Sequence, residues 1–304
     1  MNPFFSIIIP VYNGEDYILS VLNSISIQTF TDFELIIYDD LSTDNSVNFV
    51  KNWLSTNKLK SKFIISKKNN GAAYGLNKCL KNSKGTYIVF GAHDNVFHPK
   101  RLETIYSKVT KNPNIKFLSH DIYSGSLGSY KKNEGKKEVG LAKYLKFNIT
   151  NVLLFRSTLF SFDSIIAKKS LLKNYAKFIN YSPVEDFALI LDMLPMESNN
   201  YIHLSCPLMY KIISSKSQTH SHSEIINKKA IKLMQEQLIK NNITLIAAES
   251  ISQISIIRNE KILGIRNISK NPLLFLSGLL INFIRITYSF FFSRNVKISK
   301  QVFK

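Results

Sequence analysis

Apolar runs and helical repeats alternate along the first hundred residues. The runs 5–11 and 33–38 are apolar almost throughout, which is typical of strands covered on both faces, and 62–66 is predicted as a further strand. Between them, apolar residues recur every three or four positions over 17–27 and 45–57, which predicts helices. Units of strand, helix and strand pair their strands in parallel. The pattern therefore predicts an α/β fold with a mostly parallel central sheet flanked by helices.

Acidic residues follow two of the predicted strands. Asp39 and Asp40 end one apolar run, and Asp94 follows the strand predicted within 85–95. Because ligands of open α/β sheets bind at the carboxyl ends of the strands, we expect these carboxylates to share a site. The alternative for Asp40 or Ser42 is a capping role at the start of the next helix.

Charge is distributed unevenly along the 304 residues, which carry a net charge of +19. Residues 1–100 hold 10 Lys and 8 acids, a net of +2, so the other 30 basic and 13 acidic residues leave a net of +17 for the rest. Such a field attracts phosphates, whether in nucleic acid, in anionic lipid or in a diphosphate-bearing substrate.

The cysteine content and the N-terminus both favour a cytoplasmic location. Cys79 and Cys206 are too few for a disulfide framework, and the start MNPFFSIIIPVYN lacks the basic flank and long apolar core of a signal peptide. A hydrophobic content of 45% is ample for a buried core.

Five motifs occur in order between residue 4 and about residue 215. They are SIIIPVYNGEDYI, SISIQTFTDFELIIYDDLSTDNS, NNGAAYGLN, GTYIVFGAHDNVFHPKRLE and VEDFALILDM. In this order and spacing the chain resembles the inverting family 2 glycosyltransferases of the GT-A fold, of the bacterial polysaccharide or O-antigen type. The resemblance implies transfer of a sugar from a nucleotide-sugar donor, expected to be UDP-linked, to a saccharide acceptor in cell-surface polysaccharide biosynthesis. It also implies a GT-A domain over 1–215.

The resemblance further implies a set of site residues. By analogy, the nucleotide would lie against Pro10, Val11, Tyr12, Asn13, Glu15, Asp39, Asp40, Asn70, Gly71, Asn77 and His93. Asp94 would be the metal-binding acid of the DXD motif, and Asp186 the catalytic base with Glu185 beside it.

These acids suit the chemistry of sugar transfer. A divalent cation held by a carboxylate stabilises the charge that develops on a leaving diphosphate, and Asp94 is a hard oxygen ligand suited to Mg²⁺ or Mn²⁺. The acceptor hydroxyl needs a base, which Asp186 can supply. Ala92 stands where the family often has the first acid of the motif, so a catalytically degenerate nucleotide-binding scaffold is the alternative. His93 is expected either to contact ribose or phosphate or to be ordinary surface.

Other positions are less specific. Leu76 and Lys211 stand where related sequences frequently place arginine, which predicts a difference in donor specificity. The charged run 131–138 is predicted to be a solvated loop. His120 and Asp121 follow an apolar run, and we expect a structural role for them in preference to a place in the cleft.

Apolar residues at helical spacing predict that the C-terminal part, 216–304, is a helical region. The segment 272–292 is long enough to cross a bilayer, but polar residues including Arg285 form a stripe along one side. Residues 258–304 carry 9 basic residues and one acid. An apolar face with cationic flanks predicts a helix in the membrane interface at the cytoplasmic face, attached to anionic lipid. The alternative is a helix that completes the core or a dimer contact.

A membrane-bound location would suit a lipid-linked acceptor, such as a saccharide on polyprenyl diphosphate. A nucleic-acid-binding protein would also explain the positive charge, but no recognised motif accompanies it, so no nucleic acid partner is expected.

Overall fold

The computed structural model describes residues 2–140, 161–172, 200–213, 294–298 and 303. The strands are β1 (Phe5–Val11), β2 (Phe33–Asp39), β3 (Ser61–Ile65), β4 (Tyr87–Phe90), β5 (Asn95–Phe97), β6 (Phe117–Gly125), β7 (Glu134–Glu138), β8 (Ile166–Lys168), β9 (Tyr201–Ile212) and β10 (Arg294–Lys297). The helices are α1 (Ile18–Ser26), α2 (Ser46–Thr56), α3 (Ala72–Asn82), α4 (Arg101–Lys111), α5 (Leu127–Lys131) and the 3-10 helices η3 (Phe162–Ser164) and η4 (Lys169–Leu172).

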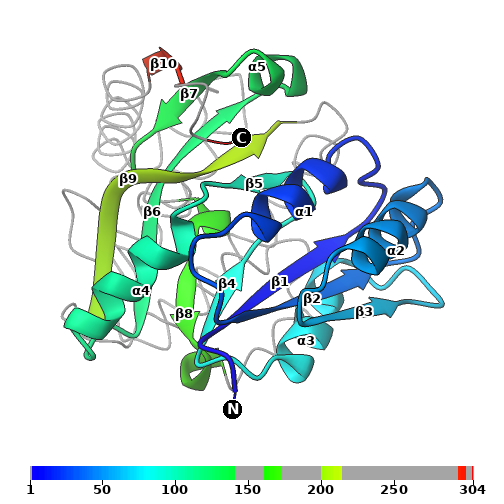
Figure 1. The fold of residues 1–304 in the computed structure, drawn as a ribbon, viewed down its shortest axis with the longest axis horizontal. Helices are drawn as coiled ribbons and strands as arrows, with labels where there is room; N and C mark the ends of the chain where they lie inside the picture. The colour runs from blue at the N-terminus through cyan, green and yellow to red at the C-terminus, as the bar shows by residue number, and fades with distance from the viewer. Residues whose placement is uncertain (1, 141–160, 173–199, 214–293, 299–302, 304) are drawn as a thin grey trace, which may run out of the picture.

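The described strands form one sheet in the order β10, β7, β6, β8, β4, β1, β2, β3, and β9 pairs with both β5 and β6. Strands β3, β2, β1 and β4 are parallel, as their helical crossovers require (Figure 1). Strand β8 enters antiparallel between β4 and β6. The predicted α/β architecture with a mostly parallel centre is therefore confirmed.

Helices cover both faces of the central strands, which explains why their sequences are apolar without alternation. One face packs against α1, whose Ile18, Val21, Leu22 and Ile25 are completely buried. On the other face, Tyr38 lies so close to α3 that a Cβ on Gly75 would come within 2.8 Å of its ring. The strands predicted over 5–11, 33–38 and 62–66 and the helices predicted over 17–27 and 45–57 are confirmed within one residue at each end. The strand predicted within 85–95 is shorter than expected, because β4 ends at Phe90, four residues before Asp94.

The charged run 131–138 is not a loop, so that prediction was wrong. Its last five residues form β7, which pairs antiparallel with β6 and with β10. The strand is only partly covered, so its charged side chains keep contact with solvent, and the Ser124 hydroxyl donates to Glu138. Backbone pairing with β6 and β10 thus determines this strand. Its sequence shows no alternation of apolar and polar side chains that would have predicted it.

Of the C-terminal part, on which two predictions were made, the structure describes only residues 294–298 and 303. Residues 294–297, within the region predicted to be helical, form β10 in the central sheet. The segment 272–292 lies outside the described residues, so its membrane contact stays a prediction. Within the part of the chain that is described, no helix is both long and apolar enough to cross a membrane.

Candidate functional site

The loops that follow β1 and β2 are joined by hydrogen bonds from both sides. The bonds are Asn13 N to Ser42 Oγ (3.0 Å), Gly14 N to Ser46 Oγ (2.8 Å), Glu15 N to Asp44 Oδ2 (3.0 Å), Thr43 N to Asn13 Oδ1 (2.9 Å) and Asn45 N to Glu15 Oε2 (3.0 Å). Asn13 and Leu41 adopt left-handed backbone, with φ of 49° and 64°. Leucine rarely does so, and the bonds between the loops hold it there. The loops therefore form one preorganised edge.

Asp40 holds the start of α3 against this edge. Its Oδ1 accepts from the backbone N–H of Asn70 (2.9 Å), and its Oδ2 accepts from that of Gly71 (2.7 Å). Gly71 immediately precedes α3 and has φ of 85°, a backbone conformation that glycine adopts without strain. Asp40, Asn70 and Gly71 are thus brought together as predicted, and the visible role of the carboxylate is to position this glycine loop.

Asp39 and Asn77 each leave one buried polar atom without a partner among the described residues. Asp39 Oδ1 accepts from Ser42 N (2.9 Å), whereas its Oδ2 is buried and has no described donor. The side-chain nitrogen of Asn77, in α3, is likewise buried without a described acceptor. Such atoms are uncommon and mark positions where water or a ligand supplies the missing bond.

The end of β1 reaches the same edge. Pro10 and Val11 pair in register with Tyr38 and Asp39, and Val11 O accepts from Asp40 N (2.9 Å). Tyr12 follows with 38% of its surface exposed, which is high for an aromatic side chain beside a buried strand. An exposed ring at this point offers a flat surface for stacking.

His93 packs against the β1 loop. A Cβ on Gly14 would lie 2.9 Å from the His93 ring, and Tyr17 stacks with that ring at 6.3 Å between centroids. The imidazole is therefore packed into this edge of the sheet. This contact joins the Asp94 loop to the loop after β1, which is hydrogen-bonded in turn to the loop after β2.

Asp94 is partly buried. Its Oδ1 accepts from the Asn95 amide (2.9 Å), and its backbone carbonyl accepts from Ile212 N (2.9 Å). Burial raises the pKa of Asp94; the ammonium of Lys211 and the His93 ring oppose that rise, and the carboxylate of Asp163 adds to it.

Asp163 is the site residue that the sequence did not reveal. The Lys211 ammonium donates to its Oδ2. Its backbone carbonyl accepts from Arg101 Nη2 (2.9 Å), and that fully buried guanidinium lies 4.0 Å from the Phe97 ring centroid. Burial lowers the pKa of Arg101 to about 9. No motif surrounds Asp163. The pairing of β5 with β9 sets Lys211 opposite Asn95, and the contact between Lys211 and Asp163 joins β9 to η3 there.

The donor set at Asp94 fits a cation that is shared with phosphate. In the part of the chain that the structure describes, no group of three or more His, Cys, Asp or Glu side chains could hold a metal, and Asp94 forms no ion pair there. Mg²⁺ and Mn²⁺ commonly take one or two carboxylates, with waters and substrate phosphates completing the shell. Asp94 suits that arrangement and does not form a protein-only cage. Asp186 and Glu185 lie outside the described residues, so their roles stay predictions.

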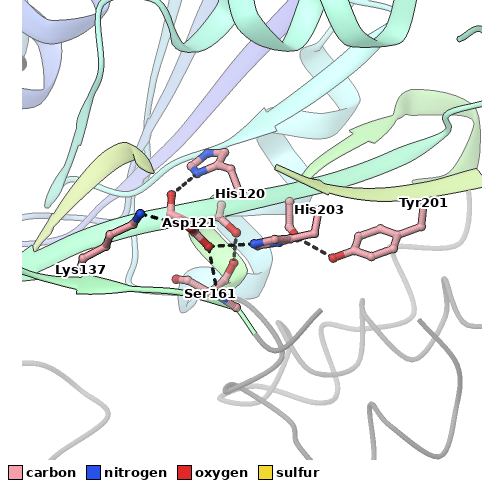
Figure 2. Close-up of polar contacts among 9 residues, drawn as sticks. His120, Asp121, Lys137, Ser161, Tyr201 and His203 are labelled. Atoms are coloured by element: carbon pink, nitrogen blue, oxygen red, sulfur yellow. Dashed lines mark hydrogen bonds and ion pairs between the residues drawn. The ribbon is translucent and has the colours of Figure 1, made fainter. Parts of the chain in front are cut away.

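A second polar cluster, the β6–β9 cluster, consists of Ser119, His120, Asp121, Tyr201 and His203. Figure 2 shows the last four of these residues. His203 Nε2 lies 2.9 Å from Asp121 Oδ1, and its Nδ1 lies 2.8 Å from Ser119 Oγ, which contacts the Tyr201 hydroxyl at 2.7 Å. The order of serine, histidine and aspartate resembles a hydrolase triad. However, Ser119 is completely buried, so no substrate reaches its hydroxyl.

His120 and Asp121 have the structural role that was favoured. His120 Nδ1 lies 2.7 Å from the Asp121 carbonyl, and burial lowers the pKa of His120 well below its ordinary value. Asp121 also accepts from Gly140 N (3.1 Å) and pairs with Lys137 at 3.9 Å. The β6–β9 cluster therefore joins β6 to β9 and lines no described site.

Comparison with known proteins agrees with this architecture. A model of the family described as glycosyl transferase family 2 matches residues 6–175. An uncharacterized glycosyltransferase of Haemophilus influenzae is 28% identical over 236 residues, which are 77% of this chain and 77% of that protein. Poly(ribitol-phosphate) beta-N-acetylglucosaminyltransferase TarP of Staphylococcus aureus is 29% identical over 228 residues, 72% of this chain and 65% of TarP.

Two solved structures have a similar fold. S. aureus TarS 1-349 in complex with UDP-GlcNAc has a TM-score of 0.61 at 22% identity, covering 84% of this chain and 72% of that one. Mannosyltransferase PcManGT from Pyrobaculum calidifontis, in complex with GDP-Man and Mn²⁺, has a TM-score of 0.57 at 14% identity, covering 96% and 88%. With the family model spanning more than half of the chain, the protein belongs to glycosyl transferase family 2 and has the GT-A fold.

Proposed function

We propose that this glycosyltransferase transfers a sugar from a UDP-linked donor to a saccharide acceptor in cell-surface polysaccharide biosynthesis, with inversion at the anomeric carbon. The observation that carries the proposal is the single edge at which the ends of β1 and β2 and the loop after β4 deliver Tyr12, Asp40 and Asp94. The names of two relatives support the donor class. TarS was solved with UDP-GlcNAc, and TarP is named as an N-acetylglucosaminyltransferase.

In this proposal the donor lies across the edge in two parts. The base stacks on Tyr12, and Asp39 Oδ2, which has no donor among the described residues, receives a donor group or a bridging water. The diphosphate extends toward the start of α3, where the backbone at Gly71 approaches closely. Asp94 holds Mg²⁺ or Mn²⁺ with the phosphate oxygens, and the bound ion supplies positive charge beside the leaving diphosphate.

The acceptor reacts on the opposite side of the sugar. Asp186 takes the proton from the acceptor hydroxyl as that oxygen bonds to the anomeric carbon, and Glu185 orients Asp186. The bond from the anomeric carbon to the diphosphate oxygen breaks, and UDP carries away the electron pair. Attack from the face opposite the leaving group accounts for inversion.

The acceptor and location complete the proposal. A saccharide on polyprenyl diphosphate suits the net charge of +17 beyond residue 100 and the apolar segment 272–292. In this proposal the protein lies at the cytoplasmic face, with that segment in the interface of an anionic membrane.

A panel of nucleotide sugars tests the function. We expect mass spectrometry to detect release of UDP from one UDP-sugar, and Asp186→Asn to lower the rate by about 10²–10⁴-fold without changing UDP affinity. An undiminished variant would remove Asp186 from its role. UDP binding without turnover of any donor would favour the alternative that Ala92 suggests, a catalytically degenerate nucleotide-binding scaffold.

A further inference from the structure

Residues 294–298 and 303 are fastened to the rest of the molecule beside β7. Strand β10 pairs antiparallel with β7 over all four of its residues, at the edge of the sheet farthest from β3 (Figure 1). The side chains of Ile298 and Phe303 are both buried. The Phe303 ring lies edge-on to the rings of His98, Tyr123 and Tyr210, with centroids 5.8, 6.0 and 6.0 Å apart. Strand β10 is therefore a fixed part of the fold.

The same contacts gather three lysines, which we call the lysine corner. Lys131 and Lys132 lie at the end of α5 and precede Asn133. Lys297 stands opposite Glu134 in the register of β10 and β7, and the N–H of the next residue donates to Asn133 O (2.8 Å). The lysine corner thus surrounds the turn between α5 and β7. All three lysine side chains are exposed, and none forms an ion pair in the part of the chain that the structure describes.

The position of the lysine corner in the chain links it to the predicted membrane segment. Strand β10 begins two residues after 272–292, for which the sequence predicts contact with an anionic membrane. A strand advances about 3.3 Å per residue, so Lys297 lies about 10 Å along β10 from Arg294. Because β10 is fixed to the sheet, a membrane in contact with that segment comes close to the lysine corner. Exposed ammonium groups at this place suit anionic lipid head groups.

An exposed apolar side chain near the lysine corner favours a membrane over a soluble polyanion. Ile213 follows β9 and is 49% exposed. Its N–H donates to Gly125 O (2.7 Å), two residues before the start of α5, so one short helix separates it from the lysine corner. Surfaces that bind a membrane interface combine apolar side chains with cations, whereas a soluble polyanion requires only the cations.

We propose that the lysine corner and Ile213 form the surface through which the folded domain docks on an anionic membrane. The inference rests on the proposed function, in which 272–292 contacts that membrane, and it adds a contact made by the folded domain itself. The ammonium groups bind the phosphates of the lipid head groups, and the Ile213 side chain enters the interface. Docking at this edge holds the sheet in one orientation relative to a lipid-linked acceptor.

Two triple variants of equal net charge test the electrostatic part. The corner variant combines Lys131→Gln, Lys132→Gln and Lys297→Gln. The control combines three exposed lysines at the other edge of the sheet, in α2 and between α2 and β3, as Lys51→Gln, Lys58→Gln and Lys60→Gln. Binding is measured by sedimentation with vesicles of equimolar phosphatidylglycerol and phosphatidylcholine, and with vesicles of phosphatidylcholine alone.

We expect the corner variant to bind the anionic vesicles about 10–100-fold more weakly than the wild type, since each lysine near an anionic surface contributes up to about fivefold. The control variant should lose less than about threefold, because charges farther from the surface than a Debye length are screened.

Ile213→Ser tests the apolar part, with Ile65→Ser as its matched control. Ile65 is 44% exposed at the end of β3, at the other edge of the sheet. We expect Ile213→Ser to weaken binding to the anionic vesicles by about threefold to tenfold, the effect of leaving half of an isoleucine side chain unburied. Its binding to soluble polyphosphate should not change. Ile65→Ser should match the wild type with both ligands.

Equal vesicle binding by the corner variant and its control would overturn the proposal and leave membrane contact to other parts of the chain. A corner variant that loses polyphosphate binding but keeps vesicle binding would also overturn it and assign the lysines to a soluble polyanion. A wild type that binds neither kind of vesicle would refute the proposed membrane location together with this inference. Thermal unfolding and UDP titration of each variant show whether the fold and the nucleotide site are kept.

Discussion

Asp94 is a partly buried acid whose ionised form destabilises the metal-free protein. Burial raises its pKa in the folded state, so ionisation above that pKa costs folding free energy, and the cost disappears at pH values where the carboxyl is protonated in both states. Natural proteins retain such a group where ligand binding requires it.

We therefore expect Asp94→Asn to raise the melting temperature of the metal-free protein at pH 7. A gain of about 2–4 °C corresponds to roughly 1 kcal/mol in a domain of this size. The gain should shrink below the ordinary carboxyl pKa of 3.8. Scanning calorimetry in chelator at both pH values checks this, and a lower melting temperature for the variant at pH 7 would contradict it.

The ring of His93 leaves no room for a side chain at position 14. A Cβ at this position would lie 2.9 Å from that ring, closer than side chains pack, so the loops after β1 and β4 would have to separate. Gly14→Ala is expected to lower the free energy of unfolding by about 1–3 kcal/mol, the usual cost of overpacking. Urea unfolding measures the change.

Gly128→Ala serves as the matched control for Gly14→Ala. Its Cβ would meet nothing closer than Ser126 Oγ at 3.7 Å, and it lies within α5, so its unfolding free energy should stay within about 1 kcal/mol of the wild type. Equal losses in both variants would show that the His93 contact is not the cause.

Among the elements, the loops after β1 and β2 determine the shape of the candidate site. Asp44 connects them, since its Oδ2 accepts from Glu15 N (3.0 Å) and its Oδ1 from Ser46 N (2.9 Å). Partial burial raises the pKa of Asp44, but hydrogen bonds from Ser46 and from the Glu15 backbone outweigh it and leave the pKa below its ordinary value. The stability that this carboxylate contributes is thus present above pH 3.8 and lost as pH falls through the lowered pKa.

Asp44→Asn is expected to cost about 0.5–2 kcal/mol of unfolding free energy at pH 7, a loss comparable to that of a helix cap, because both carboxylate oxygens accept backbone hydrogen bonds. The variant should also lose less stability than the wild type on acidification. Urea unfolding from pH 7 to pH 3 measures both. Asp16→Asn, at an exposed acid of the loop after β1, is the control and should follow the wild type. Parallel pH curves for Asp44→Asn and the wild type would contradict the assignment.

For the whole molecule, the strands with the strongest local signal were predictable. The apolar runs of β1 and β2 predicted the central strands because both faces of each are buried. Strand β7 was missed because charged residues dominate it and only its neighbours define it.

The candidate site was predictable only in part, for the same reason. Asp40 and Asp94 follow strands and could be found by position. Asp163 in η3 meets Lys211 in β9 across 48 residues, and no local pattern encodes that contact.

The central claim is that the edge formed by β1, β2 and β4 binds a nucleoside diphosphate together with a divalent cation at Asp94. Calorimetric titration of UDP, with Mn²⁺ and then with chelator, tests it most directly in the wild type and in Asp94→Asn. The account predicts saturable binding with Mn²⁺ that weakens by about tenfold or more when either the ion or the carboxylate is removed. Equal UDP affinity in all four titrations, or no binding in any, would contradict it.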